Sequence, residues 1–456
     1  MNTTKKREID LTQGPIAKQM LRFFIPIWCG IFFQQVYVTA DAIIISQVIG
    51  EDALAAVGCT GTFINLLIGF FTGISSGATV VIAQYFGARE HELVKKATHT
   101  ALVMALVLGI LFTIFGMASS PFILHLLQTP ADIFEMSTQY LRVFFLGMVP
   151  CVLYNMGSGI LRAVGDAKRP VYILIATALI NIGLDLLFTA VLRMGVRGAA
   201  LATILSQLLA CILVLWCMHH EKDLPIRLRF HELKADRRML LHITRVGLPT
   251  GLQSTMFDLS NLLIQASVNF FGTAVIAGWT AYSNINMIFW MTISAMGTTI
   301  ATFTGQNFGA GKLDRMHHGV KTALKLTGGG CILFTTLIIL LRYPLLHLFA
   351  NDPEVIEVGI RVIFIMAPAY ITYMAIEVYS GVIRGVGEAL VPMIITGLSI
   401  CAFRVVWIIW ILPFHNTMDM ICISYPISWI LGSVAFYIYY KKGNWLTSRL
   451  PESASK

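Results

Sequence analysis

The chain has 456 residues, of which 56% are hydrophobic and only 12% are charged, and its mean hydropathy is +0.74. Soluble domains have about 25% charged residues, so this composition excludes an ordinary soluble globular protein. The formal net charge of +9 would suit a nucleic-acid partner, but the positions of the charges, described below, argue against that interpretation.

Long apolar stretches recur along the whole chain, separated by short polar segments. Each has about 20 residues or more, enough for a helix to cross a hydrocarbon core of about 30 Å. Strands of a membrane barrel would be about 10 residues long with strict alternation, which this sequence does not resemble. We therefore predict an all-α integral membrane protein with twelve transmembrane helices, at residues 20–48, 54–84, 96–119, 133–161, 170–191, 197–218, 240–270, 275–306, 322–342, 356–383, 391–412 and 419–440.

The first predicted helix follows a basic N-terminus, MNTTKKREID, and is too long for the apolar core of a cleaved signal peptide. It also lacks a small-residue cleavage site, so we interpret it as a retained anchor. Pro26 lies inside this helix, where proline removes one backbone hydrogen bond, and we expect the helix to bend there. Further along, Asp41 is the one charged residue between Phe23 and Ile49.

Four acidic residues lie well inside predicted membrane helices, away from the ends of the spans: Asp41, Asp185, Asp258 and Glu377. An ionised side chain near the bilayer centre costs about 2.5–3.5 kcal/mol, so residues tolerated there are candidates for function. Asn181 and Asp185 are four residues apart, and therefore share one face of the fifth predicted helix.

Two polar residues of the first helix, Tyr37 and Gln34, precede Asp41 on the same helix. Tyr37 lies one helical turn before the acid, and an aromatic ring can hold an amphipathic cation. We therefore assign Tyr37 and Gln34 to a substrate cavity.

Two motifs occur twice at the same spacing. AQYFGARE at 83–90 returns as GQNFGAGK at 305–312, and SGILRAVGDA at 158–167 returns as SGVIRGVGEA at 380–389, both at an offset of 222 in the numbering. Because each half then contains six predicted helices, we interpret the halves as parallel repeats. We favour a packing role for these motifs, since the glycine spacing of GQNFGAGKL does not fit a phosphate-binding loop.

The repeat divides the chain into two six-helix bundles, residues 1–218 and 240–456, joined by a basic linker at 219–239. With the N-terminus inside, 27 of the 33 Lys and Arg residues fall on cytoplasmic segments. This asymmetry is typical of the positive-inside rule and places both termini in the cytoplasm, in the cell inner (plasma) membrane. It is an insertion signal, so we expect no nucleic-acid partner.

The second half does not repeat the acids of the first, because neither Asp41 nor Asp185 has an acidic counterpart at the offset of 222. Its own polar residues within predicted helices, which we assign to the substrate cavity, are Asp258, Asn261, Gln265, Glu377 and Arg404. The alternative for Arg404 is a buried ion pair with Glu377 or Asp258.

The eight cysteines are scattered singly, without a CxxC pair, and no cluster of Cys and His residues indicates a zinc site. The sequence also lacks an HExxH motif and any Ser–His or Cys–His cluster that would suggest catalysis. We therefore expect neither an enzyme nor a resident cofactor or metal, apart from Na⁺ as a possible coupling ion.

Five segments, taken as a set, resemble a known transporter family. They are LTQGPIAKQMLRFFIPI, FFQQVYVTADAIIISQVIGEDALAAVG, AQYFGARE, ILRAVGDAKRP and NIGLDLLF. Together they resemble the multidrug and toxic compound extrusion (MATE) family of cation-coupled exporters, in its prokaryotic DinF-like branch, and the resemblance covers essentially the whole chain. It implies two pseudo-symmetric bundles that work by alternating access.

The resemblance also implies that Asp41, Asn181, Asp185 and Thr203 converge on a cation-coupling site in the first bundle. Two carboxylates that share an apolar pocket cannot both stay ionised at low cost, so such a pair can hold a proton, or can bind Na⁺ with the neutral oxygens. The alternative is a buried hydrogen-bonded network that only locks the helices together.

The leading hypothesis is a secondary antiporter, a monomer in the lipid bilayer, that exports amphipathic organic cations in exchange for H⁺ or Na⁺. The main rival is a flippase for lipid-linked precursors from the same superfamily. Such a flippase should line its cavity with several Arg or Lys residues, and Arg404 is the one clear intramembrane case. A membrane-embedded enzyme is less well supported still.

Overall fold

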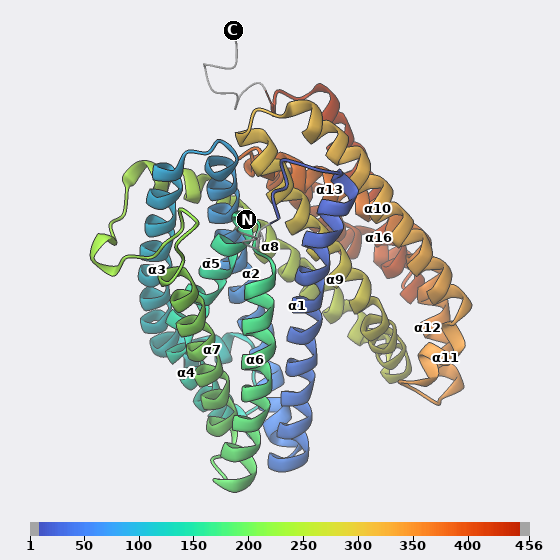
Figure 1. The fold of residues 1–456 in the computed structure, drawn as a ribbon. Helices are drawn as coiled ribbons and strands as arrows, with labels where there is room; N and C mark the ends of the chain where they lie inside the picture. Colours follow the sequence, from blue (N-terminus) through green and yellow to red (C-terminus); the bar gives the residue numbers. More distant parts are fainter. Residues whose placement is uncertain (1–8, 447–456) are drawn as a thin grey trace. The chain divides into compact units, whose positions relative to one another are not determined.

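The structure is a computed structural model that describes residues 9–446. Within this range every regular element is a helix (Figure 1), which confirms the predicted all-α class. The basic residues at positions 1–8 and 447–456, which contribute to the predicted orientation, lie outside the described residues. The chain divides into two compact units, which we describe in turn.

Among the described residues, unit 1 comprises 9–10 and 25–247. Its helices are α1 (Ile16–Ile44, from residue 25 onward), α2 (Glu51–Gly87), α3 (His91–Leu126), α4 (Phe134–Leu146), α5 (Met148–Ala163), α6 (Lys168–Asp185), α7 (Val196–His219) and the first turns of α8 (Arg237–Val268). Helix α5 packs against α2, α3 and α7 (Figure 1), so it forms the centre of this bundle. Phe71, Phe145 and Met156 are among the side chains of its buried core.

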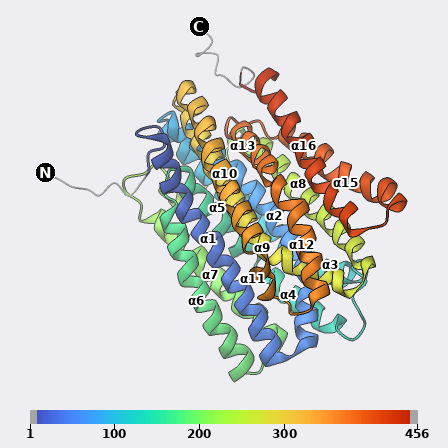
Figure 2. The same cartoon turned by 90° about the vertical axis from the view of Figure 1, so that its right-hand side faces the viewer.

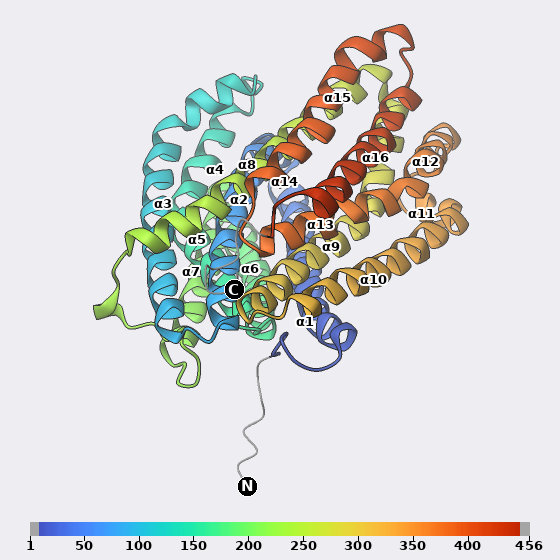
Figure 3. The same cartoon turned by 90° about the horizontal axis from the view of Figure 1, so that it is seen from above.

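Unit 2 comprises residues 11–24 and, as far as the structure describes the chain, 248–446. Its helices are α8 from residue 248 onward, α9 (Thr273–Gly309), α10 (Leu313–Leu340), α11 (Arg342–His347), α12 (Pro353–Met366), α13 (Tyr370–Gly385), α14 (Leu390–Thr396), α15 (Phe403–Val406) and α16 (Met418–Lys442). Helix α13 packs against α9, α10 and α16, and Figures 2 and 3 show these helices running side by side. It takes the central place that α5 has in unit 1.

The boundaries of the helices repeat between the units. Helices α2 and α9 each have 37 residues and begin at residues 51 and 273, and α5 and α13 each have 16 residues and begin at 148 and 370. Gly50 and Gly272 precede α2 and α9 with φ angles of 126° and 92°, a region that glycine adopts readily. The predicted internal repeat and its offset are therefore confirmed.

The first turns of α1 belong to unit 2, whereas the rest of this helix belongs to unit 1. The segment before α1 is fixed to unit 2 by its backbone. The N–H of the buried Leu11 donates to Gln306 Oε1 at 3.3 Å, and its carbonyl accepts from Asn307 Nδ2 at 3.2 Å. Lys312 Nζ donates to the carbonyl of Thr12 at 2.9 Å. Side chains that are distant in sequence thus hold the beginning of α1.

Helix α8 is divided in the opposite sense, since its first turns belong to unit 1 and the remainder, from Leu248, to unit 2. Residues 219–239, interpreted above as a linker, therefore belong to unit 1. In α1 the division lies between Phe24 and Ile25, beside Pro26, and the helix runs through this proline without interruption. The bend expected at Pro26 stays a prediction.

Ten helical segments in the described part of the chain are long and apolar enough to cross a membrane. An eleventh is obtained if α4 and α5, which meet at an angle of 50°, form one bent span. The twelfth predicted span corresponds to α8, which has 32 residues but carries Arg237, Arg238 and Arg245 in its first turns and Gln253 and Asp258 further along. These side chains leave α8 less apolar than the other spans. The chain is a multi-pass membrane protein.

Candidate functional site: a carboxylate pair and a cavity in unit 1

Two acidic residues of unit 1 lie beside irregular turns of helix. Asp41 is near the end of α1, which continues as a π-helix at Ile45–Ile49, and Asp185 ends α6, which continues as a π-helix at Leu186–Val191. The two π-helices pack against each other, and so bring the ends of α1 and α6 together. Such wide turns are frequent at functional sites. No sequence pattern described above predicts them.

The side chains of Asp41 and Asp185 interact with each other. Asp185 is fully buried, and neither of its carboxylate oxygens has a hydrogen-bond partner; Asp41 Oδ1 is also buried without one. The ion pairs found among residues 9–446 include neither acid. Two ionised carboxylates repel each other in this position, so the pair is chemically suited to hold one proton or one small cation.

Asn181 and Thr203 lie on α6 and α7, and both line a cavity within unit 1. Asn181, one turn before Asp185, is buried, and neither its Oδ1 nor its Nδ2 has a hydrogen-bond partner. The hydroxyl of Thr203 donates to the carbonyl of Ala199 at 3.2 Å, which leaves its oxygen able to accept or to bind a cation. Both residues therefore present neutral oxygens at this cavity.

Two tyrosines and a glutamine line the same cavity as Asn181 and Thr203. Tyr37 and Gln34 of α1 line the cavity, and Tyr37 lies near both Asp41 and Asp185. Tyr154 of α5 is also in the lining.

Tyr140 of α4 lies near the same two acids, and sequence reasoning missed it. It sits in a different helix, far along the chain from both acids. No local spacing connects it with them, because only the tertiary packing of α4 brings it close.

The cavity is lined by residues of α1, α2, α5, α6 and α7 and has a volume of about 140 Å³. Pockets for drug-sized ligands usually have about 300–1,000 Å³. In this structure the cavity therefore accommodates an ion, water or a small chemical group, and not a whole drug. Its further polar lining includes Asn155, Ser158, Arg162, Thr177 and Gln207.

In unit 2, Glu377 forms an ion pair with Arg384, seven residues later on α13, at 3.0 Å. Gly297 of α9 makes room for this acid, since a Cβ added there would overlap Glu377 Oε1. The pairing with Arg404 that the sequence left open is therefore not formed by Glu377.

Arg404 is completely buried in unit 2. Its Nε donates to Ser428 Oγ at 3.0 Å, and its guanidinium lies over the ring of Tyr425 at 3.8 Å, whereas Nη1 and Nη2 have no hydrogen-bond partner. Asp258 does not form an ion pair with it within the described part of the chain. The guanidinium of Arg404 is thus stabilised by the ring of Tyr425 and the hydroxyl of Ser428, and not by an acid among the described residues.

The remaining polar candidates of α8 have different surroundings. Asp258 and Asn261 are half-buried. Gln265 accepts from Trp279 Nε1 at 3.0 Å and donates to Asn269 Oδ1 at 3.0 Å, so its amide is occupied within unit 2. Of the three, Asp258 and Asn261 are therefore the better placed to contact a ligand.

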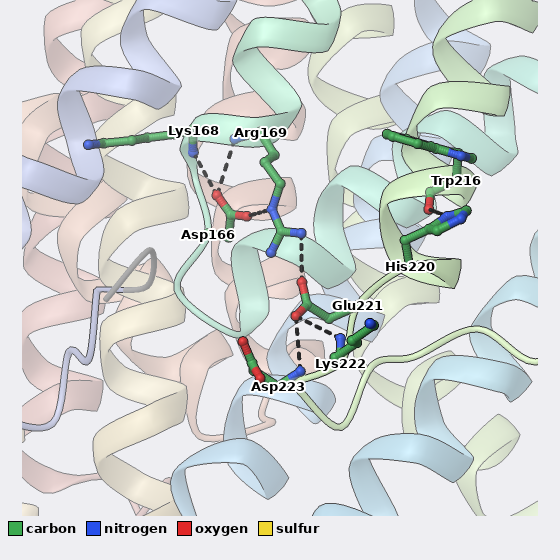
Figure 4. Close-up of polar contacts among 8 residues, drawn as sticks. All are labelled: Asp166, Lys168, Arg169, Trp216, His220, Glu221, Lys222 and Asp223. Carbon is green, nitrogen blue, oxygen red and sulfur yellow. Dashed lines mark hydrogen bonds and ion pairs between the residues drawn. The ribbon is translucent and has the colours of Figure 1, made fainter. Parts of the chain in front are cut away.

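A polar cluster joins the loop before α6 to the end of α7 (Figure 4). Asp166 accepts from the backbone N–H groups of Lys168 and Arg169, each at 3.1 Å, and so satisfies two donors at the start of α6. Arg169 pairs with Asp166, and with Glu221 at 2.6 Å. Burial disfavours the ionised form of Glu221, but the hydrogen bond and charge of Arg169 outweigh it and lower the pKa of Glu221. The repeated motif around Asp166 thus has a structural role.

The sequence pattern of one family, MatE, matches residues 26–187 and 249–410, one match in each half of the chain. The chain belongs to the MatE family. The second match begins near the start of the second half, in agreement with the repeat found in the structure. As a MatE protein, the chain is a membrane transporter and not an enzyme.

Curated MatE relatives resemble this chain along almost its whole length. The probable multidrug resistance protein YoeA of Bacillus subtilis is 26% identical over 93% of this chain and 94% of its own, and YpnP of the same organism, with the same description, is 26% identical over 97% and 98%. Among solved structures, a MOP superfamily transporter from Pyrococcus furiosus has a TM-score of 0.89 at 24% identity, and the match covers 98% of this chain and 100% of that one. This structural likeness supports the MatE fold.

Proposed function

We propose that this MatE transporter is a secondary active antiporter that exports amphipathic organic cations in exchange for H⁺ or Na⁺. The observation that carries the proposal is the pair of Asp41 and Asp185, two interacting carboxylates with buried oxygens that lack partners. Such a pair in a membrane helix bundle is costly unless it binds a cation. The relatives described as probable multidrug resistance proteins support a drug as the exported substrate.

Exchange follows from competition for the negative charge of the carboxylate pair. A proton bridges the two acids, or Na⁺ binds them with the oxygens of Asn181 and Thr203. A cationic substrate binds better when the pair is ionised and unoccupied, so each ligand weakens the binding of the other. Alternating access requires different ligand affinities in two states of the protein, and the occupancy of the pair supplies that difference.

We propose α1 as the element that responds to this occupancy. It carries Asp41, and it carries Pro26, whose missing N–H weakens the helix at one point. In unit 2 we propose Asp258 and Asn261 as substrate contacts. Gln265, Glu377 and Arg404 have partners within unit 2, and we assign them to shaping the substrate cavity.

We further propose that the protein is a monomer in the cell inner membrane with both termini in the cytoplasm. The concentration of Lys and Arg on segments assigned to the cytoplasm supports this orientation. Apart from the coupling ion, the mechanism needs no cofactor, and it needs no nucleic-acid partner.

The test is the accumulation of a fluorescent cationic drug in everted membrane vesicles, with a pH gradient and a Na⁺ gradient imposed separately. We expect accumulation with one of the two gradients and its collapse when the matching ionophore is added. The Asp41→Asn variant, present at the same level in the membrane, should bind the drug but not accumulate it. Accumulation that neither gradient changes, or wild-type accumulation by Asp41→Asn, would contradict the proposal.

A further inference from the structure

The cavity in unit 1 contains a positive charge that the proposed cation exchange does not use. Arg162, near the end of α5, is the only charged residue among the described residues that line this cavity. The side chains that line the cavity with it are apolar or neutral and polar, so no acid in the lining neutralises the guanidinium.

Two hydrogen-bond donors in this lining are free. Arg162 Nε and Ser158 Oγ are both buried, and neither has a hydrogen-bond partner. Tyr154 lies beside Ser158, but its own hydroxyl donates to the carbonyl of Pro170 at 3.4 Å. Because Ser158 and Arg162 are four residues apart on α5, they share one helix face, the face that lines the cavity.

The nearest acid in sequence is already occupied. Asp166 accepts two backbone N–H groups and pairs with Arg169 (Figure 4). A buried donor or charge without a partner is unfavourable, so the guanidinium of Arg162 is prepared for a ligand with negative charge.

The second half of the chain provides an internal comparison. At the offset of 222, Ser158 and Arg162 correspond to Ser380 and Arg384, and the Oγ and Nε atoms of this second pair likewise have no partner. There, however, the guanidinium is neutralised by Glu377 at 3.0 Å.

The residue that corresponds to Glu377 in unit 1 is Asn155, which is neutral. The side-chain amide of Asn155 donates to the carbonyl of Cys151 at 2.9 Å. The residue that corresponds to Gly297, which makes room for Glu377, is Ser75, and Ser75 Oγ donates to the carbonyl of Asn155 at 2.8 Å. The repeat has thus kept the arginine in both halves, but unit 1 lacks both the acid and the space for it.

We propose that the Arg162 end of the unit 1 cavity binds an anionic oxygen group, of the carboxylate, sulfonate or phosphate type, on the transported molecule. The planar guanidinium fits such groups with parallel hydrogen bonds, and Ser158 Oγ supplies a further donor. A cavity of about 140 Å³ admits a group of this size without the rest of the molecule. The inference rests on the proposed function in one respect, that the molecule bearing the anion is also the exported cation, so the favoured substrates are zwitterions.

The test compares two dyes that share one cation and differ in one charge. Rhodamine 6G carries its carboxyl as an ethyl ester, and the corresponding free acid is a zwitterion at pH 7.5. Binding of each dye to the purified, detergent-solubilised protein is measured by fluorescence anisotropy. We expect the free acid to bind on the order of tenfold more tightly than the ester, the size expected for a hydrogen bond to a charged group. Arg162→Gln should reduce this preference to about onefold while the affinity for the ester changes little.

A second variant tests the same point without removing the arginine. The double substitution Ser75→Gly with Asn155→Glu gives unit 1 the acid and the space that unit 2 has, and should also abolish the preference for the free acid. The matched control is Arg384→Gln, which removes the arginine that Glu377 already neutralises and should leave the preference unchanged.

The outcomes separate this inference from the proposed function. If the wild-type protein binds the two dyes equally, or if Arg162→Gln weakens both to the same extent, there is no anion site at Arg162. If the dye preference is found but vesicles show no gradient-driven accumulation, the antiport proposal is wrong and the anion site stands.

Discussion

The carboxylate pair of unit 1 gives a quantitative prediction. If Asp41 and Asp185 carry two negative charges about 4 Å apart, at an effective dielectric constant of about 20, they repel each other by about 4 kcal/mol. One bound proton or Na⁺ relieves this repulsion, and about 4 kcal/mol corresponds to on the order of a thousandfold in affinity. Asp185→Asn removes one of the charges. The coupling ion should then lose most of this advantage, and drug binding should lose its dependence on pH and Na⁺.

The assay is the affinity of the purified protein for a permanently charged fluorescent cation, measured at pH 6 and pH 8, with and without Na⁺. The wild type should bind the drug more weakly at low pH or in Na⁺, and Asp41→Asn and Asp185→Asn should bind it alike in all four conditions. Because the two acids act as a unit, the double variant of Asp41→Asn and Asp185→Asn should lose little more of the pH and Na⁺ dependence of drug binding than either single variant. Asp258→Asn changes an acid that we propose as a substrate contact in unit 2, so it should weaken drug binding in every condition but keep the wild-type change of affinity with pH and Na⁺.

One result would refute the reasoning directly. If Asp185→Asn keeps the wild-type change in drug affinity with pH and Na⁺, the interaction between the two acids is not the source of coupling. If the double variant loses the sum of the changes in pH and Na⁺ dependence seen in the two single variants, Asp41 and Asp185 act independently.

Three further predictions concern other parts of the chain. Glu377→Gln leaves Arg384 without its ion pair and should lower the free energy of unfolding by about 2 kcal/mol, seen as a lower melting temperature in detergent. The variant should alter the range of substrates more than ion coupling. A loss of ion-driven transport with intact drug binding would contradict the assignment of Glu377 to the substrate cavity. Glu221→Gln should lower the melting temperature at pH 7. Because the pKa of Glu221 is lowered in the folded protein, the melting temperature of the wild type should approach that of the variant as the pH falls below about 4.3, the ordinary pKa of glutamate. A difference in melting temperature that stays constant down to pH 3 would contradict this prediction. A cysteine at position 230 should react with a membrane-impermeant maleimide in everted vesicles and not in intact cells, and the opposite pattern would reverse the predicted orientation.

Much of the fold was predictable because it depends on local pattern. Apolar length defines the spans, and the repeat follows from motifs such as AQYFGARE and SGILRAVGDA, whose offset recurs in the helix boundaries. The main departure is α8, in which the charges of the first turns and the polar side chains of Gln253 and Asp258 reduce the apolar character. The exchange of the first turns of α1 and α8 between the units could not be predicted, because apolar length says nothing about which bundle a turn packs against.

The site was predictable only in part. Asp41, Asp185 and Asn181 stand out as polar residues in apolar helices, but their convergence was implied by the family resemblance and not by spacing. The ion pair of Glu377 and Arg384 had a local signal that was missed, since residues seven apart lie on one face of a helix. Tyr140 and the charge of Arg162 in the cavity had no such signal, because they depend on how α4 and α5 pack.

The divided first helix has a consequence for biosynthesis. Leu11 leaves the ribosome well before its backbone partner Gln306, which follows 295 residues later. The N-terminal turns must therefore wait, without their final contacts, until most of the chain has been translated and α9 has entered the membrane. We expect this docking to be a late step of assembly, and we expect neither half of the chain, expressed alone, to complete its bundle until the other is supplied.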